Sequence, residues 1–425
     1  MLDAGRARRR YLVLLGLRWL PTGFLVPVLI LLMLERGLTL AETGLVSAVT
    51  GVTVLLLELP TGGLSDTLGR RPVLLASCAA SLAAVALLLV ADSLVLFVAA
   101  AVLTGVFRAL DSGPLESWYV DAALADDADA DIETGLARGG VALGVAISVG
   151  AVIAGGLVAL DPVPSLDALA VPVLAALVLQ VVGLVVTALL LVEPRAPSGS
   201  FSTRAAVLAV PATIGSGLRL LRAPVLACLV GVEVTWGLGM VTWEQLLPVR
   251  LAEVAGDRDV AAALLGPAAS AAWLCSAAGA AAVPWLTRRL GTAVAAAALR
   301  VAQGATVAVM ALAAGPVGVL AAFLVTLVVH GASNPAHRVL VHRQVDASRR
   351  NTVLSLNSMA GFGSFAVGAV ALSVLADATS VSTAIVAGAV VLALGAPLYL
   401  PAHRQARRAA HSDAGPGHHR ANLEA

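Results

Sequence analysis

Long apolar runs separated by short polar connections constrain this chain more than any other feature. The first run extends from about Tyr11 to Leu34. It is too long for a signal-peptide core of roughly 7 to 15 residues, so we expect it to remain as a transmembrane helix. Further runs of roughly 17 to 25 residues can each cross a hydrocarbon core of about 30 Å. They begin near Thr43, Pro72, Leu94, Leu136, Ala170, Pro224, Ala261, Thr292, Pro316, Thr352 and Thr379. The sequence therefore predicts an all-α integral membrane protein with twelve transmembrane helices.

The placement of the arginines indicates which ends of these helices face the cytosol. The segment before the first helix and the connections on the same side carry most of them, including Arg70 and Arg71. The opposite connections hold only Arg36, Arg250 and Arg258. Cytoplasmic loops of membrane proteins carry an excess of Lys and Arg. We therefore expect a multi-pass protein of the cell membrane, the inner or plasma membrane of a bacterium, with both termini in the cytosol.

The composition excludes several classes of site. Hydrophobic residues make up 59% of the chain and charged residues 12%, against roughly 25% charged residues in soluble domains. The sequence contains no lysine, so a P-loop lysine, a lysine Schiff base and a pyridoxal site are impossible. Cys78, Cys228 and Cys275 lie in apolar runs and are interpreted as buried thiols. We expect that the chain is not an enzyme and has no cofactor, metal site or nucleic-acid partner. Its energy source would be an ion gradient or the substrate itself.

A glycine-rich, doubly basic segment, GGLSDTLGRR at Gly62–Arg71, connects the second and third predicted helices. Gly69 is expected to adopt a positive φ, and the arginines are expected to stay in the cytosol. The segment resembles the signature loop of the major facilitator superfamily, except that Thr67 replaces a basic residue. The resemblance implies two pseudo-symmetric six-helix bundles with a substrate cavity between them. It also implies a role in conformational gating for Gly62, Asp66, Gly69, Arg70 and Arg71.

An internal repeat is consistent with two halves. Aligning PWLTRRLG at Pro284–Gly291 with GGLSDTLG at Gly62–Gly69 also places Arg108 on His330. A Pro/Ser/Gly-rich linker begins near Glu193. We predict an N-terminal six-helix half at 1–192, a cytoplasmic central loop at 193–223, a C-terminal six-helix half at 224–400 and a cytoplasmic tail at 401–425. The tail is expected to be disordered.

Two further patterns resemble a bacterial subgroup of the family that is populated by drug and metabolite exporters. The second helix ends in ELPTGG, which includes Glu58, and the fourth helix carries SGPLESWYVD at Ser112–Asp121. In the fifth helix, Gly150 and Gly155 match an antiporter motif, but Ala151 stands where that motif has proline. Glycines at these positions also allow close helix packing, so the direction of transport stays open.

Ionisable residues inside the predicted helices are candidates for function, because each costs about 2.5 to 3.5 kcal/mol at the bilayer centre. Arg18, Glu58, Arg108 and Asp111 are expected in the cytoplasmic half of the first bundle. They fit either a structural ion-pair network or proton coupling. Arg108 also resembles an arginine that many members of the family place in the fourth helix and that is linked to proton transfer.

In the second half, Glu233 lies near the middle of the seventh predicted helix, one turn before Trp236. It is the best candidate for a carboxylate in the cavity, and the alternative is a hydrogen-bonded structural acid. Arg300 is expected to snorkel or pack rather than contact substrate, and His330 is a candidate to titrate. We assign proton coupling to Glu58, Arg108, Asp111 and Glu233, and the substrate cavity to Arg18, Trp19, Glu233 and Trp236.

These observations predict a secondary active transporter that exports a small amphipathic compound, coupled to proton entry, by alternating access. A proton-linked importer of a metabolite is one alternative. A transport-inactive receptor or a membrane-embedded enzyme is another, and the short soluble loops count against it. The expected partners are the lipid bilayer, a small-molecule substrate and protons, and the chain is expected to act as a monomer.

Overall fold

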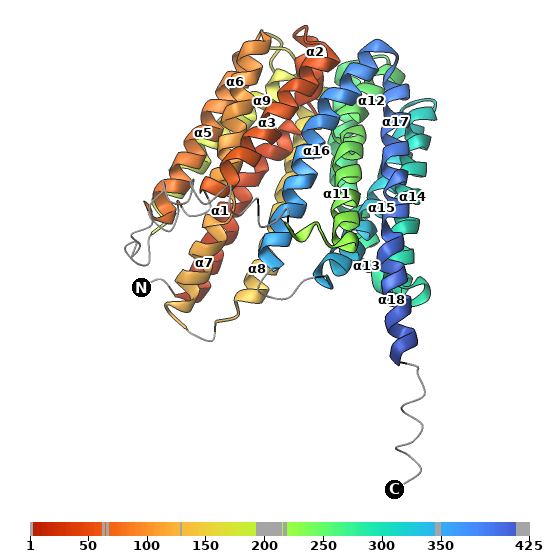
Figure 1. Ribbon diagram of the computed structural model, residues 1–425. Coiled ribbons are helices and arrows are strands. Elements are labelled where there is room, and N and C mark those ends of the chain that lie inside the picture. The colour runs from red at the N-terminus through yellow and green to blue at the C-terminus, as the bar shows by residue number, and fades with distance from the viewer. Residues whose placement is uncertain are drawn as a thin grey trace, which may run out of the picture.

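The structure is a computed structural model that describes residues 3–61, 64, 68–127, 130–192, 215, 219–344 and 350–413. Every regular element in these residues is helical (Figure 1). The N-terminal half consists of α1 (Ala4–Leu25), α2 (Leu29–Glu35), α3 (Leu40–Thr61), α5 (Arg70–Val90), α6 (Leu94–Asp111), α7 (Pro114–Leu124), α8 (Ile132–Leu160) and α9 (Ala170–Leu190). The C-terminal half consists of α11 (Pro224–Val241), a π-helical turn (Thr242–Leu246), α12 (Leu247–Ala255), α13 (Arg258–Leu290), α14 (Thr292–Leu312), α15 (Pro316–His342), α16 (Arg350–Ala378), α17 (Val381–Leu394), a 3-10 turn (Ala396–Tyr399) and α18 (Leu400–Asp413).

The prediction of an all-α membrane fold is confirmed. Eleven stretches of the described chain are long and apolar enough to cross a membrane, and α1 with α2 forms a twelfth, bent by 40°. Pro27 lies in the break between α1 and α2, where its missing N–H interrupts the helix. The predicted disorder of the tail is wrong up to Asp413, because α18 extends the last span and packs Ala402 into the core. The predicted central loop lies mostly outside the described residues, and the domain boundaries stay a prediction.

Two glycines begin equivalent helices in the two halves. Gly69 precedes α5 with a φ of +88°, and Gly291 precedes α14 with a φ of +78°. Glycine adopts such angles without the steric cost that a Cβ would add. The positive φ predicted for Gly69 is therefore confirmed, and the aligned glycine of the repeat shares it.

The two halves meet through two helix pairs, α3 with α16 and α8 with α13. Helices α2 and α12 lie at one end of the molecule, and the start of α1 and α18 lie at the opposite, terminal end (Figure 1). We call the first end the closed end, because hydrogen bonds join α3 to α16 there. The backbone N–H groups of Leu40 and Ala41, at the start of α3, donate to the carboxylate of Asp377 near the end of α16 (3.3 and 2.7 Å). Gln245 Nε2 lies 3.3 Å from Thr43 Oγ1 and donates to it. Polar contacts thus tie the halves together at this end.

A glycine contact draws α8 and α13 together. A Cβ on Gly155 would lie 2.8 Å from the carbonyl oxygen of Ala263 and 3.2 Å from the Cα of Gly266, so a larger residue would displace a helix. Small residues permit this close approach of two backbones. Close helix packing therefore explains why residue 155 is a glycine. The residue does not indicate a direction of transport.

Two arginines bind helix ends at the closed end. Arg36 follows α2 and donates to the carbonyl oxygens of Leu88 and Ala91 at the C-terminus of α5 (2.8 and 2.7 Å). Arg250 of α12 donates to the carbonyl oxygen of Ala313 at the C-terminus of α14 (3.1 Å). The last carbonyls of a helix lack partners within the helix and carry partial negative charge. In each half, an arginine at the end of the first span therefore caps the C-terminus of the third span.

Candidate functional site

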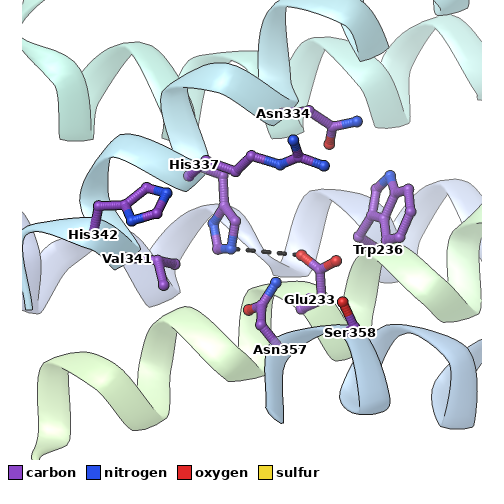
Figure 2. Close-up of a pocket in the computed structure, with 9 residues that line it drawn as sticks. Glu233, Trp236, Asn334, His337, Val341, His342, Asn357 and Ser358 are labelled. Carbon is purple, nitrogen blue, oxygen red and sulfur yellow. Dashed lines mark ion pairs between the residues drawn. The ribbon is translucent and has the colours of Figure 1, made fainter. Parts of the chain in front are cut away.

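A cavity of about 330 Å³ lies in the C-terminal half, toward the terminal end (Figure 2). This volume falls at the lower end of the range for small-molecule sites, roughly 300 to 1,000 Å³. Helices α11, α15 and α16 supply its walls. The lining residues are Glu233, Trp236, Asn334, His337, Arg338, Val341, His342, Asn357 and Ser358. Two residues that the sequence assigns to a substrate cavity, Glu233 and Trp236, thus occupy one site, because they are three positions apart on α11.

Glu233 and His337 face each other at the wall of this cavity (Figure 2). Glu233 Oε2 lies 3.5 Å from His337 Nε2, and the side chains are 14% and 3% exposed. On its far side, His337 Nδ1 lies 3.0 Å from the hydroxyl of Tyr399. A solute in the cavity can therefore reach the carboxylate. The largely buried imidazole shares the cavity wall, and the phenol of Tyr399 lies on the far side of the imidazole. His337 and Tyr399 are absent from the predicted site, although they complete it.

Arg300 of α14 is fully buried beside this group. Its Nη1 donates to Gln303 Oε1 at 2.9 Å, and α14 packs against the turn that carries Tyr399. No carboxylate forms an ion pair with it in the part of the chain that the structure describes. Of the two roles expected for Arg300, snorkelling and packing, the structure supports packing, because no part of the guanidinium reaches the surface.

His330 lies one layer deeper, among aromatic and amide side chains. Its ring stacks on Trp236, with centroids 5.8 Å apart, and lies at an angle to Trp243 at 5.5 Å. Its two nitrogens lie 3.3 Å from Gln303 Nε2 and 3.3 Å from Asn334 Nδ2. The ring therefore helps to hold Trp236 against the cavity, and its titration stays a prediction.

The N-terminal half holds a different buried group. Arg18 of α1 forms an ion pair with Asp111 of α6. The Arg18 guanidinium also donates to Ser77 Oγ (2.8 Å) and Cys78 Sγ (3.0 Å) of α5. The structure thus brings Arg18 and Asp111 together and confirms Cys78 as a buried free thiol. The group joins three helices of one half.

The other predicted residues of this half lie elsewhere. Arg108 is exposed on α6 and is not part of the Arg18–Asp111 pair. Trp19 is partly buried against a core cluster of the N-terminal half. Neither Arg18 nor Trp19 lines the cavity that contains Glu233. The side chain of Glu58 lies outside the described part of the structure.

Of the five predicted gating residues, the structure describes Gly69, Arg70 and Arg71, whereas Gly62 and Asp66 lie outside the described residues. Arg70 forms an ion pair with Asp121 of α7, and Arg71 Nη2 donates to the carbonyl oxygen of Ala188 in α9 (2.9 Å). Asp121 belongs to the segment SGPLESWYVD. Two motifs that are separate in the sequence therefore meet, and the two arginines tie α5 to the neighbouring helices.

The comparisons with known proteins agree with this architecture. The Major Facilitator Superfamily matches residues 12–361 of the chain, whereas no curated protein sequence matches it. The crystal structure of the nucleoside transporter NupG is similar, with a TM-score of 0.76 and 12% identity, over 93% of this chain and 98% of that chain. A bacterial homologue of the iron transporter ferroportin in an inward-facing state has a TM-score of 0.72 and 17% identity, over 93% and 98%. An inward-facing, occupied bacterial homologue of the human lysosomal transporter Spinster has a TM-score of 0.72 and 13% identity, over 93% and 96%. These low identities show a shared fold.

Proposed function

Because the chain belongs to the major facilitator superfamily, we propose that it is a secondary active transporter that exports a small amphipathic compound, coupled to proton entry, by alternating access. The observation that carries this proposal is the asymmetry of the two ends. The halves are tied together at the closed end through Asp377, while the Glu233 cavity lies toward the other end. Alternating access requires a state that is closed on one side and offers a site on the other.

We place the terminal end in the cytosol, because the arginine-rich connections and the start of α1 lie there. The cavity then faces inward, and the transporter acts as a monomer in the bilayer. A cysteine replacing Arg404 would be shielded from an impermeant thiol reagent in intact cells, and one replacing Asp257 at the closed end would react. Labelling of position 404 from outside would overturn this orientation.

We assign proton exchange first to Glu233. Its carboxylate borders the cavity, and His337 Nε2 lies beside it, 3.5 Å from Glu233 Oε2. A carboxylate held inside the membrane beside a second titratable group has a ready partner for proton transfer. Glu58, Arg108 and Asp111 of the N-terminal half are the further candidates for this role.

The function is tested in two steps. A growth-inhibition and efflux screen over chemically diverse compounds supplies a substrate, and purified protein is then reconstituted in proteoliposomes with an imposed pH difference. An exchanger accumulates substrate when the lumen is acidic, because protons leave as substrate enters. A proton-linked importer accumulates substrate when the exterior is acidic. A protonophore should abolish either response, and the lack of any substrate-dependent flux would contradict transport altogether.

A further inference from the structure

Exposed arginines gather at the terminal end of the C-terminal half, on helices that one core cluster holds together. Leu226 at the start of α11, Ala293 at the start of α14 and Ala402 of α18 belong to this cluster, and Leu286 near the end of α13 packs against it. Helix α18 contacts both α11 and α14. We call the exposed arginines of these helices and of the segment before α11 the basic surface: Arg219, Arg222, Arg288, Arg289, Arg404 and Arg408.

No carboxylate neutralises the basic surface within the residues that the structure describes. None of its arginines forms an ion pair there, and the sequence contains no Asp or Glu at 194–232, 260–345 or 378–412. The terminal end of the N-terminal half differs, because Arg6 is ion-paired with Asp3 and Arg70 with Asp121. Clustered charge of one sign attracts counter-ions from solution. The basic surface therefore fits an anionic partner from outside the chain.

The centre of the basic surface lies at the depth of the lipid headgroups. Helix α14 has 21 residues, so it is about 30 Å long and matches the hydrocarbon core. Its first residue then lies at the edge of that core, and Arg288 and Arg289 come just before it. Trp285 is 52% exposed, and the Arg289 guanidinium lies 4.8 Å above its ring. Tryptophan is enriched where a membrane meets water. This end of α13 thus presents two cations and an aromatic ring to the interface.

We propose that the basic surface binds the phosphate groups of anionic phospholipids, with Arg288, Arg289 and Trp285 at its centre. A guanidinium offers two parallel N–H groups to the oxygens of one phosphate. The stacking of Arg289 on Trp285 holds one guanidinium in place, and the indole can pack on the upper part of an acyl chain. Clusters of four to eight basic residues beside a membrane helix are typical of anionic-lipid binding. The proposal is independent of the substrate and of the direction of transport.

The test measures lipid binding to the purified full-length protein in detergent. Thermal unfolding is followed with dioleoyl phosphatidylglycerol or with dioleoyl phosphatidylcholine, which have the same acyl chains and differ in net charge. We expect a saturable rise in the unfolding temperature with phosphatidylglycerol. The double variant Arg288→Gln with Arg289→Gln should bind this lipid about thirtyfold more weakly, because each arginine near an anionic lipid surface strengthens binding about fivefold. Arg288→Lys with Arg289→Lys keeps both charges and should retain most of the affinity.

Matched variants separate a site from overall charge. Arg6→Gln with Arg10→Gln also removes two charges from the terminal end, where Asp3 and the carbonyl oxygen of Leu190 hold these arginines. It should leave the affinity for phosphatidylglycerol unchanged, with each variant compared with its own lipid-free unfolding temperature. Trp285→Ala should weaken binding, whereas Trp273→Ala, at an exposed position earlier on the same helix, should not.

Three results would overturn the proposal. Equal stabilisation by phosphatidylcholine would mean that the acyl chains alone are bound. An equal loss of affinity in the Arg6/Arg10 and Arg288/Arg289 glutamine variants would leave overall charge as the cause. Equal stabilisation by free glycerol phosphate would assign the basic surface to a soluble anion rather than to a lipid.

Discussion

The two halves treat buried charge differently. In the N-terminal half, Arg18 is neutralised by the adjacent carboxylate of Asp111. In the C-terminal half, Arg300 has no such partner within the described chain, and Glu233 instead borders a cavity beside His337. A buried ion pair is costly to break once formed, whereas a carboxylate next to an imidazole can change its protonation without a change in packing. We therefore expect the ion pair to hold the N-terminal half together and Glu233 to exchange protons in the C-terminal half.

The largest expected effect is that of Glu233→Gln. Gradient-driven accumulation should disappear, because the amide cannot release a proton, while exchange of substrate for substrate should persist. The measurement is flux in proteoliposomes with and without an imposed pH difference. Ser358→Ala, in the same cavity wall, is the matched control and should leave coupling intact. Full accumulation by Glu233→Gln would show that Glu233 does not exchange the proton.

Asp111→Asn should act mainly on folding. It leaves the Arg18 guanidinium buried and unpaired, which costs about 3 to 5 kcal/mol of unfolding free energy, a large part of the roughly 5 to 15 kcal/mol that stabilises a typical protein. The double variant Arg18→Leu with Asp111→Leu should recover most of this loss. Arg300→Met should cost far less, because no paired carboxylate is left behind. Thermal unfolding in detergent measures all three, and an equal loss in Arg300→Met would remove the distinction between the halves.

Asp377→Asn should have a moderate effect on conformation. The carboxylate of Asp377 accepts from two N–H groups at the start of α3 in the other half. A charge at such a helix end contributes about 0.3 to 1 kcal/mol. Its loss should therefore raise the ratio of molecules that are open at the closed end to molecules that are closed there by about two- to fivefold. Spin labels at the start of α3 and the end of α16 report the distance.

A neighbouring residue controls for a local effect. Glu42→Ala removes an acceptor for the Thr39 N–H within the same half and should leave the inter-half distance unchanged. Asp66, outside the described residues, is predicted from its motif to act at the opposite end, so Asp66→Asn should shift the population the other way. Identical distances in Asp377→Asn and wild type would mean that the contact does not hold the ends together.

The smallest effect is a local pH dependence at the start of α8. Hydrogen bonding from the Thr134 backbone N–H to the exposed Asp131 carboxylate lowers the pKa of that carboxyl below 3.8. A lowered pKa means that the stabilisation is present above the unfolded-state pKa and is lost as the pH falls through the folded-state pKa. Asp131→Ala should therefore speed amide hydrogen exchange at the start of α8 at neutral pH and not at about pH 2. If Asp131→Ala still exchanged faster than wild type at about pH 2, the loss of the Asp131 cap would not be the cause of the faster exchange.

Much of the fold follows from local pattern. Membrane-length apolar runs predict the spans, and the loop sequence predicts the positive φ of Gly69. Glu233 and Trp236 are found from their spacing on one helix. The meeting of His337 with Tyr399 is not predictable in this way, because the residues come from α15 and from the turn after α17. Arg300 illustrates a second limit: a lone arginine in an apolar run looks the same whether it snorkels or is buried.

The two arginine caps at the closed end have a consequence for biosynthesis. Arg36 and the carbonyls that it binds in α5 all lie within the first 91 residues. Arg250 and Ala313 likewise belong to one contiguous stretch. Each cap closes within its own half, so the first half can complete this contact on the ribosome before α11 has been synthesised. A gene split in the region that encodes residues 193–223 should therefore yield two polypeptides that insert separately and associate through α3 with α16 and α8 with α13.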